Sequence, residues 1–216
     1  MGCSGTHEEG CSKRIIIWAP PRSRSTALEK SFRNRKDTKV NHEIFGDVYY
    51  NLTKKISEED TMDKAKQEVI NGAAEKGQFA STTYEQVFNS LLQDESSQFI
   101  VAKELSYYYD EKEMTVERMK HFQHVFLTRH PRETLTSFFR ETKKTDGSGY
   151  FDPKEAGFKE LADVYNFVKT NIDSNPFVLD AEDLVRGPAV LEDLLKNMCA
   201  RLNMPFDRGM TGWKSG

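Results

Sequence analysis

Cysteine is scarce in this chain of 216 residues, which contains three: Cys3, Cys11 and Cys199. The count is odd, and no two cysteines form a C-x-x-C pair. This pattern excludes the disulfide framework of small secreted domains and the paired thiolates of a zinc site. We therefore expect reduced thiols, a cytoplasmic protein and no bound metal.

Long apolar runs and a strong excess of one charge are also missing. No run approaches the ~20 residues that a membrane-spanning helix needs, and no signal-peptide apolar region opens the chain. The net charge of −3 does not favour nucleic acid as a partner. The start MGCSGT nevertheless fits the pattern for myristoylation of Gly2, with Cys3 placed for a second acyl group. Membrane association through these two residues therefore stays open beside a plain flexible leader.

The composition fits one folded domain, because hydrophobic residues make up 37% and aromatic residues 11% of the chain. We expect a flexible tail over residues 1–13 and one domain over residues 14–216. Short apolar runs bounded by turn residues predict buried strands. These runs are residues 14–19, 39–45, 98–105, 124–130 and 176–184.

Helical spacing of apolar residues fills most of the sequence between these strands. The predicted helices are residues 25–36, 45–56, 62–76, 83–93, 114–122, 131–144, 158–172 and 187–203. Strands that alternate with helices predict an α/β fold of three layers, with a central parallel sheet covered by helices on both faces. In such sheets ligands bind at the carboxyl ends of the strands, so that edge is where we look for a site.

The first strand runs into an arginine-rich turn, WAPPRSRST, before a helix. A helix N-terminus points unpaired amides outward and favours negative charge. Charge-assisted and hydroxyl donors add to them, with Ser25 or Thr26 as the expected helix cap. These donors are Arg22, Ser23, Arg24, Ser25 and Thr26. The turn lacks the glycines and lysine of the Walker P-loop, which disfavours a standard ATP or GTP hydrolase.

Local charge supports an anion site in this region. Residues 13–36 contain eight lysines and arginines and one acid, Glu29. A second strand-to-helix turn, FLTRHPRET, carries Arg129 and places Pro131 at the first turn of a helix, where its missing N–H costs nothing. Ser137 follows Arg129 by about two helical turns, roughly 10 Å of rise, so a shared ligand needs the arginine to reach along the helix.

These two turns resemble the sulfotransferases that use 3′-phosphoadenosine 5′-phosphosulfate (PAPS). Their first loop reads P-[KR]-S-G-[ST]-T, and this chain has PRSRST at residues 21–26. Their second element reads R-x-P-x-x-x-x-x-S, and RHPRETLTS matches it with Arg129, Pro131 and Ser137. LDAEDL at residues 179–184 is similar to a late element of the small members of the family. The resemblance covers residues 14–216 and implies the P-loop NTPase-like sulfotransferase fold.

The resemblance also implies a role for each matching residue. Arg22, Ser23, Ser25 and Thr26, with the loop amides and Arg24, would bind the 5′-phosphosulfate, and Arg22 would stabilise the charge on the leaving group. Arg129 and Ser137 would hold the 3′-phosphate. Arg24 stands where the general loop has glycine, which is acceptable if the backbone there avoids a positive φ. Asp180 and Asp183 are interpreted as structural.

The end of the chain departs from the family. The sequence stops at GMTGWKSG, where the sulfotransferases continue and carry a further loop for the 3′-phosphate. A truncated C-terminus, a natural short form and a less complete donor site therefore stay open as alternatives.

Transfer of a sulfuryl group needs a base for the acceptor proton. His42 and Glu43 in NHEIF, and Glu104 in AKEL, are the candidates. The resemblance favours Glu43, whereas His42 has the better intrinsic pKa, and the two face opposite sides if the segment is extended. Lys103 would assist the sulfuryl group. The tyrosines of DVYY and SYYYD fit the core or its rim better than an acceptor pocket.

The sequence therefore predicts an enzyme that transfers a sulfuryl group from PAPS to a hydroxyl or amine of a small-molecule or carbohydrate acceptor. The products are the sulfated acceptor and adenosine 3′,5′-bisphosphate. A magnesium-dependent small-molecule kinase with an atypical phosphate loop and a noncatalytic nucleotide-binding module are the alternatives. The acceptor's identity and the oligomeric state are not readable from the sequence.

Overall fold

The computed structural model describes residues 12–59, 82–145, 147 and 151–212. Residues 1–11 of the predicted tail, with Gly2 and Cys3, the predicted helix over residues 62–76 and the last four residues lie outside the described residues. Lys13, the last residue of the predicted tail, is already the first residue of a strand. Within the described ranges, no helix is long and apolar enough to cross a membrane.

A five-stranded parallel sheet forms the centre of the fold, with the strands in the order β2-β3-β1-β4-β5. Its strands are β1 (Lys13–Ala19), β2 (Thr38–His42), β3 (Phe99–Leu105), β4 (Gln123–Thr128) and β5 (Phe177–Asp180). All seven residues of β3 are buried, as expected for a strand covered on both faces. The register pairs Ile17 of β1 with Lys103 of β3 and with Val125 of β4.

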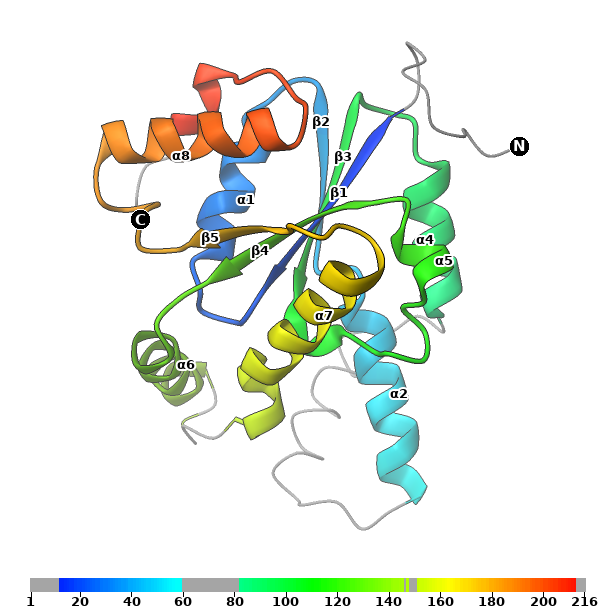
Figure 1. The fold of residues 1–216 in the computed structure, drawn as a ribbon. Helices are drawn as coiled ribbons and strands as arrows, with labels where there is room; N and C mark the ends of the chain where they lie inside the picture. Colours follow the sequence, from blue (N-terminus) through cyan, green and yellow to red (C-terminus); the bar gives the residue numbers. More distant parts are fainter. Residues whose placement is uncertain (1–11, 60–81, 146, 148–150, 213–216) are drawn as a thin grey trace.

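Helices cover both faces of the sheet (Figure 1). They are α1 (Ser25–Arg33), α2 (Gly46–Glu59), α4 (Tyr84–Gln93), α5 (Val116–Met119), α6 (Pro131–Thr145), α7 (Phe158–Asn171) and α8 (Pro188–Arg201). Three short 3₁₀ helices are η1 (Ser106–Tyr108), η2 (Pro153–Ala156) and η3 (Arg208–Thr211). Figure 1 shows α1 and α8 on one face and α4, α5 and α7 on the other.

Alternation along β1 divides the core between the two faces. Ile15 and Ile17 pack in one hydrophobic cluster with Leu28 of α1 and Leu195 of α8. Ile16 and Trp18 point to the other face, where the cluster includes residues of α2, α4 and α7. The predicted three-layer α/β/α fold with a central parallel sheet is confirmed.

Several strands end earlier than the sequence predicts. The predicted strand over residues 39–45 stops at His42, because Glu43 has a φ of 53° and turns the chain out of the sheet. The strands predicted to reach residues 130 and 184 stop at Thr128 and Asp180. Pro131 and Pro188 begin α6 and α8, as predicted from the tolerance of the first helical turn for proline.

The carboxyl ends of β1, β3 and β4 meet at one edge of the sheet. The chain leaves β1 towards β2 on one side, and β4 and β5 add on the other side. This reversal of strand order is the place where parallel α/β sheets bind ligands. Both arginine-rich turns follow strands at this edge, so the fold brings them to the same region.

Candidate active site

The loop between β1 and α1 holds two arginines in the left-handed region. Arg22 has a φ of 61° and Arg24 a φ of 63°. The condition under which arginine at position 24 would be acceptable, a backbone without a positive φ, is therefore not met. A residue with a side chain in this conformation carries strain of roughly 1 kcal/mol or more, which proteins retain mainly at functional sites. The left-handed backbone at Arg24 leads directly into the first turn of α1.

The start of α1 leaves its first turn open. Arg24 is the N-cap residue and makes no capping hydrogen bond with its side chain, and the first turn contains no acid. Ser25 is the first helical residue, so the expected cap at Ser25 or Thr26 is wrong. Uncapped amides and the helix dipole together favour an anion at this position.

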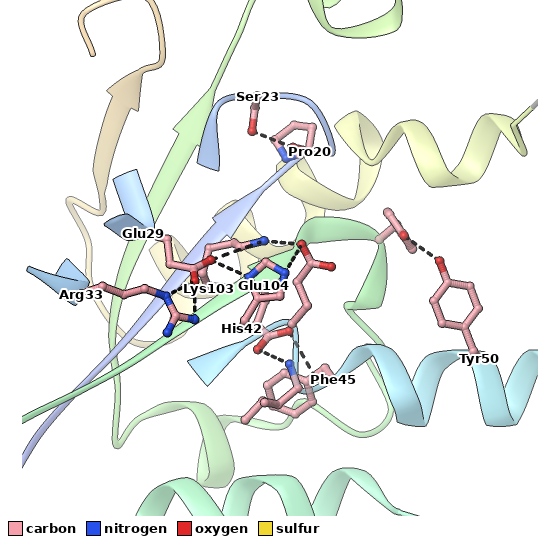
Figure 2. Close-up of polar contacts among 12 residues, drawn as sticks. Pro20, Ser23, Glu29, Arg33, His42, Phe45, Tyr50, Lys103 and Glu104 are labelled. Carbon is pink, nitrogen blue, oxygen red and sulfur yellow. Dashed lines mark hydrogen bonds and ion pairs between the residues drawn. The ribbon is translucent and has the colours of Figure 1, made fainter. Parts of the chain in front are cut away.

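Ser23 stabilises the loop from within. Its side chain is fully buried, and its hydroxyl donates to the carbonyl oxygen of Pro20 at 2.6 Å (Figure 2). Ser25 is also buried, whereas Thr26 is exposed. Ser25 and Thr26 line a cavity beside the loop together with Arg22.

Arg129 lies against the first loop. Its guanidinium donates from Nη1 to the carbonyl oxygen of Arg22 at 3.1 Å and from Nε to Glu182 Oε1 at 3.0 Å. The same carboxylate oxygen lies 2.5 Å from Arg24 Nη1. The hydrogen bond from Arg129, followed by that from Arg24, lowers the pKa of Glu182. The two arginine-rich turns therefore form one electropositive edge held together by Glu182.

Glu182 is a residue that the sequence reasoning did not single out. It lies in LDAEDL, between the two aspartates that were interpreted as structural. Asp180 accepts a hydrogen bond from the Glu182 amide at 2.9 Å, and Asp183 pairs with Arg186 at 2.8 Å. The aspartates thus shape the turn that presents Glu182 to the arginines.

Ser137 lies beside Arg22 in this structure and not beside Arg129. Arg22 Nε donates to the hydroxyl of Ser137 at 3.3 Å, and Nη2 lies 3.3 Å from Glu141 Oε2. Both partners are on α6, one helical turn apart. The shared role of Arg129 and Ser137 at one phosphate stays a prediction. In this structure Ser137 contacts Arg22, whereas Arg129 contacts Glu182 and the Arg22 carbonyl.

A buried ammonium group lies beside the candidate base Glu43. Lys103, on β3, is 1% exposed. Its Nζ contacts the Glu43 carboxylate and lies 3.9 Å from Glu29 Oε2. Glu43 follows β2, the neighbour of β3, and its backbone N–H donates to the Lys103 carbonyl at 2.8 Å. Lys103 therefore holds the carboxylate of the favoured base.

Glu29 extends this network to His42 (Figure 2). Its side chain is 3% exposed and lies 2.6 Å from His42 Nδ1 and 2.6 Å from Arg33 Nη2. His42 Nε2 lies 3.7 Å from Glu43 Oε1. His42 and Glu43 were expected on opposite sides only if the segment is extended, and the positive φ of Glu43 ends the extended segment there. His42 contacts Glu29, and Glu43 contacts Lys103.

Glu29 could have been found in the sequence, since it is the single acid among the eight basic residues of positions 13–36.

Glu104 has a different position from the other candidate bases. Its side chain is fully buried, and its two oxygens accept from the backbone N–H groups of Ile44 at 3.0 Å and Phe45 at 3.2 Å. Burial raises the pKa of Glu104 well above its usual value, while these hydrogen bonds oppose the rise. Glu104 orients the turn that presents Glu43.

A cavity of about 400 Å³ joins the two sides of the site. Arg22, Ser25 and Thr26 from the first loop line it together with Glu43. Of the candidate bases in the described part of the chain, Glu43 is the one that contributes to this lining. Tyr50 and Tyr107, two of the tyrosines expected in the core or its rim, also line the cavity.

The described residues contain no group of three or more His, Cys, Asp or Glu side chains that could hold a metal ion. The chemistry available at the edge is instead that of three guanidinium groups, a helix N-terminus and a carboxylate. This arrangement can neutralise an anionic leaving group and accept a proton in the same cavity.

Solved structures with this fold include several sulfotransferases. The sulfotransferase domain from the curacin biosynthetic pathway superposes with a TM-score of 0.57 at 21% identity, covering 94% of this chain and 77% of that domain. The domain from the Synechococcus PCC 7002 olefin synthase gives 0.57 at 19% identity, covering 94% and 78%. Mouse sulfotransferase SULT7A1, complexed with PAP, gives 0.54 at 11% identity, covering 93% and 61%. At these identities the likeness concerns the fold.

Two curated proteins of Arabidopsis thaliana are similar in sequence. Branched-chain-amino-acid aminotransferase-like protein 1 is 28% identical over 208 residues, which are 94% of this chain and 32% of that protein. Branched-chain-amino-acid aminotransferase-like protein 2 is 31% identical over 100 residues, which are 46% of this chain and 16% of that protein. The chain thus spans a third or less of the length of these relatives.

The sequence model of the sulfotransferase domain matches residues 13–216, nearly the whole chain. The match covers both arginine-rich turns, the turn with Glu43 and the cavity between them. The resemblance inferred from the sequence is confirmed, and the chain belongs to the sulfotransferase domain family.

Proposed function

We propose that this protein transfers a sulfuryl group from PAPS to a hydroxyl or amine of an acceptor. The observation that supports this most is the shared cavity, where Arg22 and the open start of α1 meet the Glu43 carboxylate. A reaction that displaces an anionic leaving group needs positive charge at one end and a base at the other. Both lie at the carboxyl edge of the sheet.

The residues at this edge fit the donor's two anionic groups. Arg22, Ser25, Thr26 and the first amides of α1 would bind the 5′-phosphosulfate. Arg129 would face the 3′-phosphate. Arg24, which the sequence placed at the 5′-phosphosulfate, shares the Glu182 carboxylate with Arg129 and would therefore face the 3′-phosphate too. Guanidinium groups that donate to one carboxylate oxygen at 2.5 and 3.0 Å can donate to a phosphate oxygen as well.

Glu43 would act as the base. It takes the proton of the acceptor as the acceptor's oxygen or nitrogen forms a bond to sulfur and the bond from sulfur to the leaving phosphate oxygen breaks. Lys103 and, through His42, Glu29 hold Glu43 in position. Arg22 would stabilise the negative charge that develops on the leaving oxygen. The prediction that Lys103 also assists the sulfuryl group remains, although its ammonium contacts Glu43 here.

Transfer of labelled sulfate from PAPS, measured without magnesium, tests this proposal. Arg22→Ala should reduce kcat by about 10²–10³, the usual scale for losing one donor to a developing charge. Glu43→Gln should reduce kcat by about 10²–10⁴, the scale for removing a general base. Lys30→Ala, an exposed charge on α1, is the matched control and should keep the activity.

The outcomes separate the alternatives. Wild-type kcat in both site variants would overturn the assigned roles. Magnesium-dependent transfer of phosphate from ATP would instead favour the small-molecule kinase. Binding of the bisphosphate product with no turnover of any acceptor would favour the noncatalytic module.

A further inference from the structure

The cavity has a lining that the donor chemistry does not explain. Two aromatic pairs contribute to it. The rings of Phe138 and Phe151 stack with their centroids 4.4 Å apart and their planes at 17°. The hydroxyls of Tyr50 and Tyr107 lie 2.9 Å apart. A volume of about 400 Å³ with aromatic faces suits a small molecule that carries a ring.

The polar part of the same lining is acidic. Besides Glu43, the carboxylates of Glu141, Asp152 and Glu155 line the cavity. Of the described lining residues Arg22 alone is cationic, and its guanidinium lies 3.3 Å from Glu141. The acids therefore outnumber the cation around the space that an acceptor would fill.

The carboxylates of Asp152 and Glu155 act electrostatically on the nearby tyrosines. Burial raises the pKa of Tyr50 to about 12, and the charge of Glu155 adds to that rise. Burial likewise raises the pKa of Tyr49, next to it on α2, with further contributions from Glu155 and Asp152. Asp152 and Glu155 are engaged in contacts of their own, and their charge still acts across the wall.

We propose that the acceptor is a small hydroxylated aromatic molecule that carries a protonated amine; this rests on the proposed sulfuryl transfer. The hydroxyl would lie at Glu43 and Arg22, and the ring against the aromatic pairs. The ammonium would lie near Asp152 and Glu155, where carboxylates and aromatic faces both favour a cation. An acceptor with an anionic tail meets like charge in the same place.

A matched acceptor series tests the inference. Tyramine, tyrosol and 4-hydroxyphenylacetate share the phenol ring and differ in a tail that is cationic, neutral or anionic. We expect kcat/KM to fall in that order, by about tenfold or more from the ammonium to the carboxylate. Equal values for the three acceptors would overturn the charge preference.

The Glu155→Gln variant locates the preference. It should lower the ratio of kcat/KM for tyramine to kcat/KM for tyrosol, while the affinity for adenosine 3′,5′-bisphosphate stays unchanged. Glu85→Gln, the same change at an exposed position of α4, should leave this ratio as in the wild type. An unchanged ratio in Glu155→Gln would overturn the assignment of the ammonium to this wall.

Failure of this inference can be told apart from failure of the proposed function. If the bisphosphate binds and another acceptor is sulfated while all three phenols are inert, the aromatic amine is wrong and sulfuryl transfer stands. If the bisphosphate does not bind and no acceptor is sulfated, both fall.

Discussion

Replacement of Lys103 by methionine tests the buried network that holds Glu43. The Lys103 ammonium is 1% exposed and lies between the carboxylates of Glu43 and Glu29, which are 26% and 3% exposed. Methionine fills a similar volume without the charge. The variant therefore leaves two carboxylates close together, one of them almost fully buried, without the cation that separates them.

The expected loss follows from this geometry. Removing one partner of a fully buried ion pair costs roughly 3–5 kcal/mol, because the remaining charge stays buried without compensation. Glu43 is partly exposed and Arg33 still contacts Glu29 at 2.6 Å, so part of the charge stays compensated. We expect Lys103→Met to lower the free energy of unfolding by about 2–4 kcal/mol at neutral pH. The turnover should fall as well, because Glu43 loses its contact.

Urea denaturation at neutral pH measures this loss. Lys30→Met, on the exposed side of α1, is the control for removal of a lysine and should change stability by less than about 0.5 kcal/mol. The double variant, Lys103→Met with Glu43→Gln, should lose less free energy of unfolding than the sum of the losses in the two single variants, because the two groups interact. A Lys103→Met protein as stable as the Lys30→Met control would refute the reasoning.

Three further changes test other parts of the structure. Arg129→Ala should weaken binding of adenosine 3′,5′-bisphosphate by about 10–100-fold, the scale of one charge-assisted bond, whereas Arg118→Ala on α5 should not; equal affinities in calorimetry would remove Arg129 from the site. Burial lowers the pKa of His124 to about 4. The contribution of the neutral ring to the free energy of unfolding is therefore complete above pH 6.5, and about 3 kcal/mol of that free energy is lost as the pH falls from 6.5 to 4. His124→Gln should flatten stability in that window, and an unchanged pH dependence would contradict this. The raised pKa of Glu104 gives a pH dependence of the opposite sign. The contribution of the protonated Glu104 side chain to stability is complete below 4.5, the pKa of the group in the unfolded chain, and is lost as the pH rises. The stability of the wild type relative to Glu104→Gln should therefore decline towards neutral pH. A constant difference between the two proteins in pH-dependent denaturation would count against it.

Local patterns in the sequence were enough for the architecture. The run of isoleucines in β1, the apolar first half of β3 and the prolines at the starts of α6 and α8 are signals within a few residues. The alternation of strands and helices then fixes a parallel sheet, and the parallel sheet fixes the edge where both arginine-rich turns lie. The ends of strands were less predictable, because a single left-handed residue, Glu43, ends β2 early.

The contacts across the site could not be predicted in the same way. Glu182 and Arg24 are 158 positions apart in the sequence, and only the folded sheet brings them together. Glu29 meets His42 and Lys103 for the same reason. The positive φ at Arg24 depends on the whole loop, and its strain has no signature in the residue type.

The most direct test of the account is a calorimetric titration with adenosine 3′,5′-bisphosphate in the presence of a metal chelator. In the proposed site one phosphate lies at Arg22 and the start of α1, and the other lies at Arg129. The bisphosphate should therefore bind without magnesium and at least about tenfold more tightly than adenosine 5′-monophosphate, which lacks the second phosphate. Equal affinity for the two nucleotides, or binding of the bisphosphate only with magnesium, would contradict it.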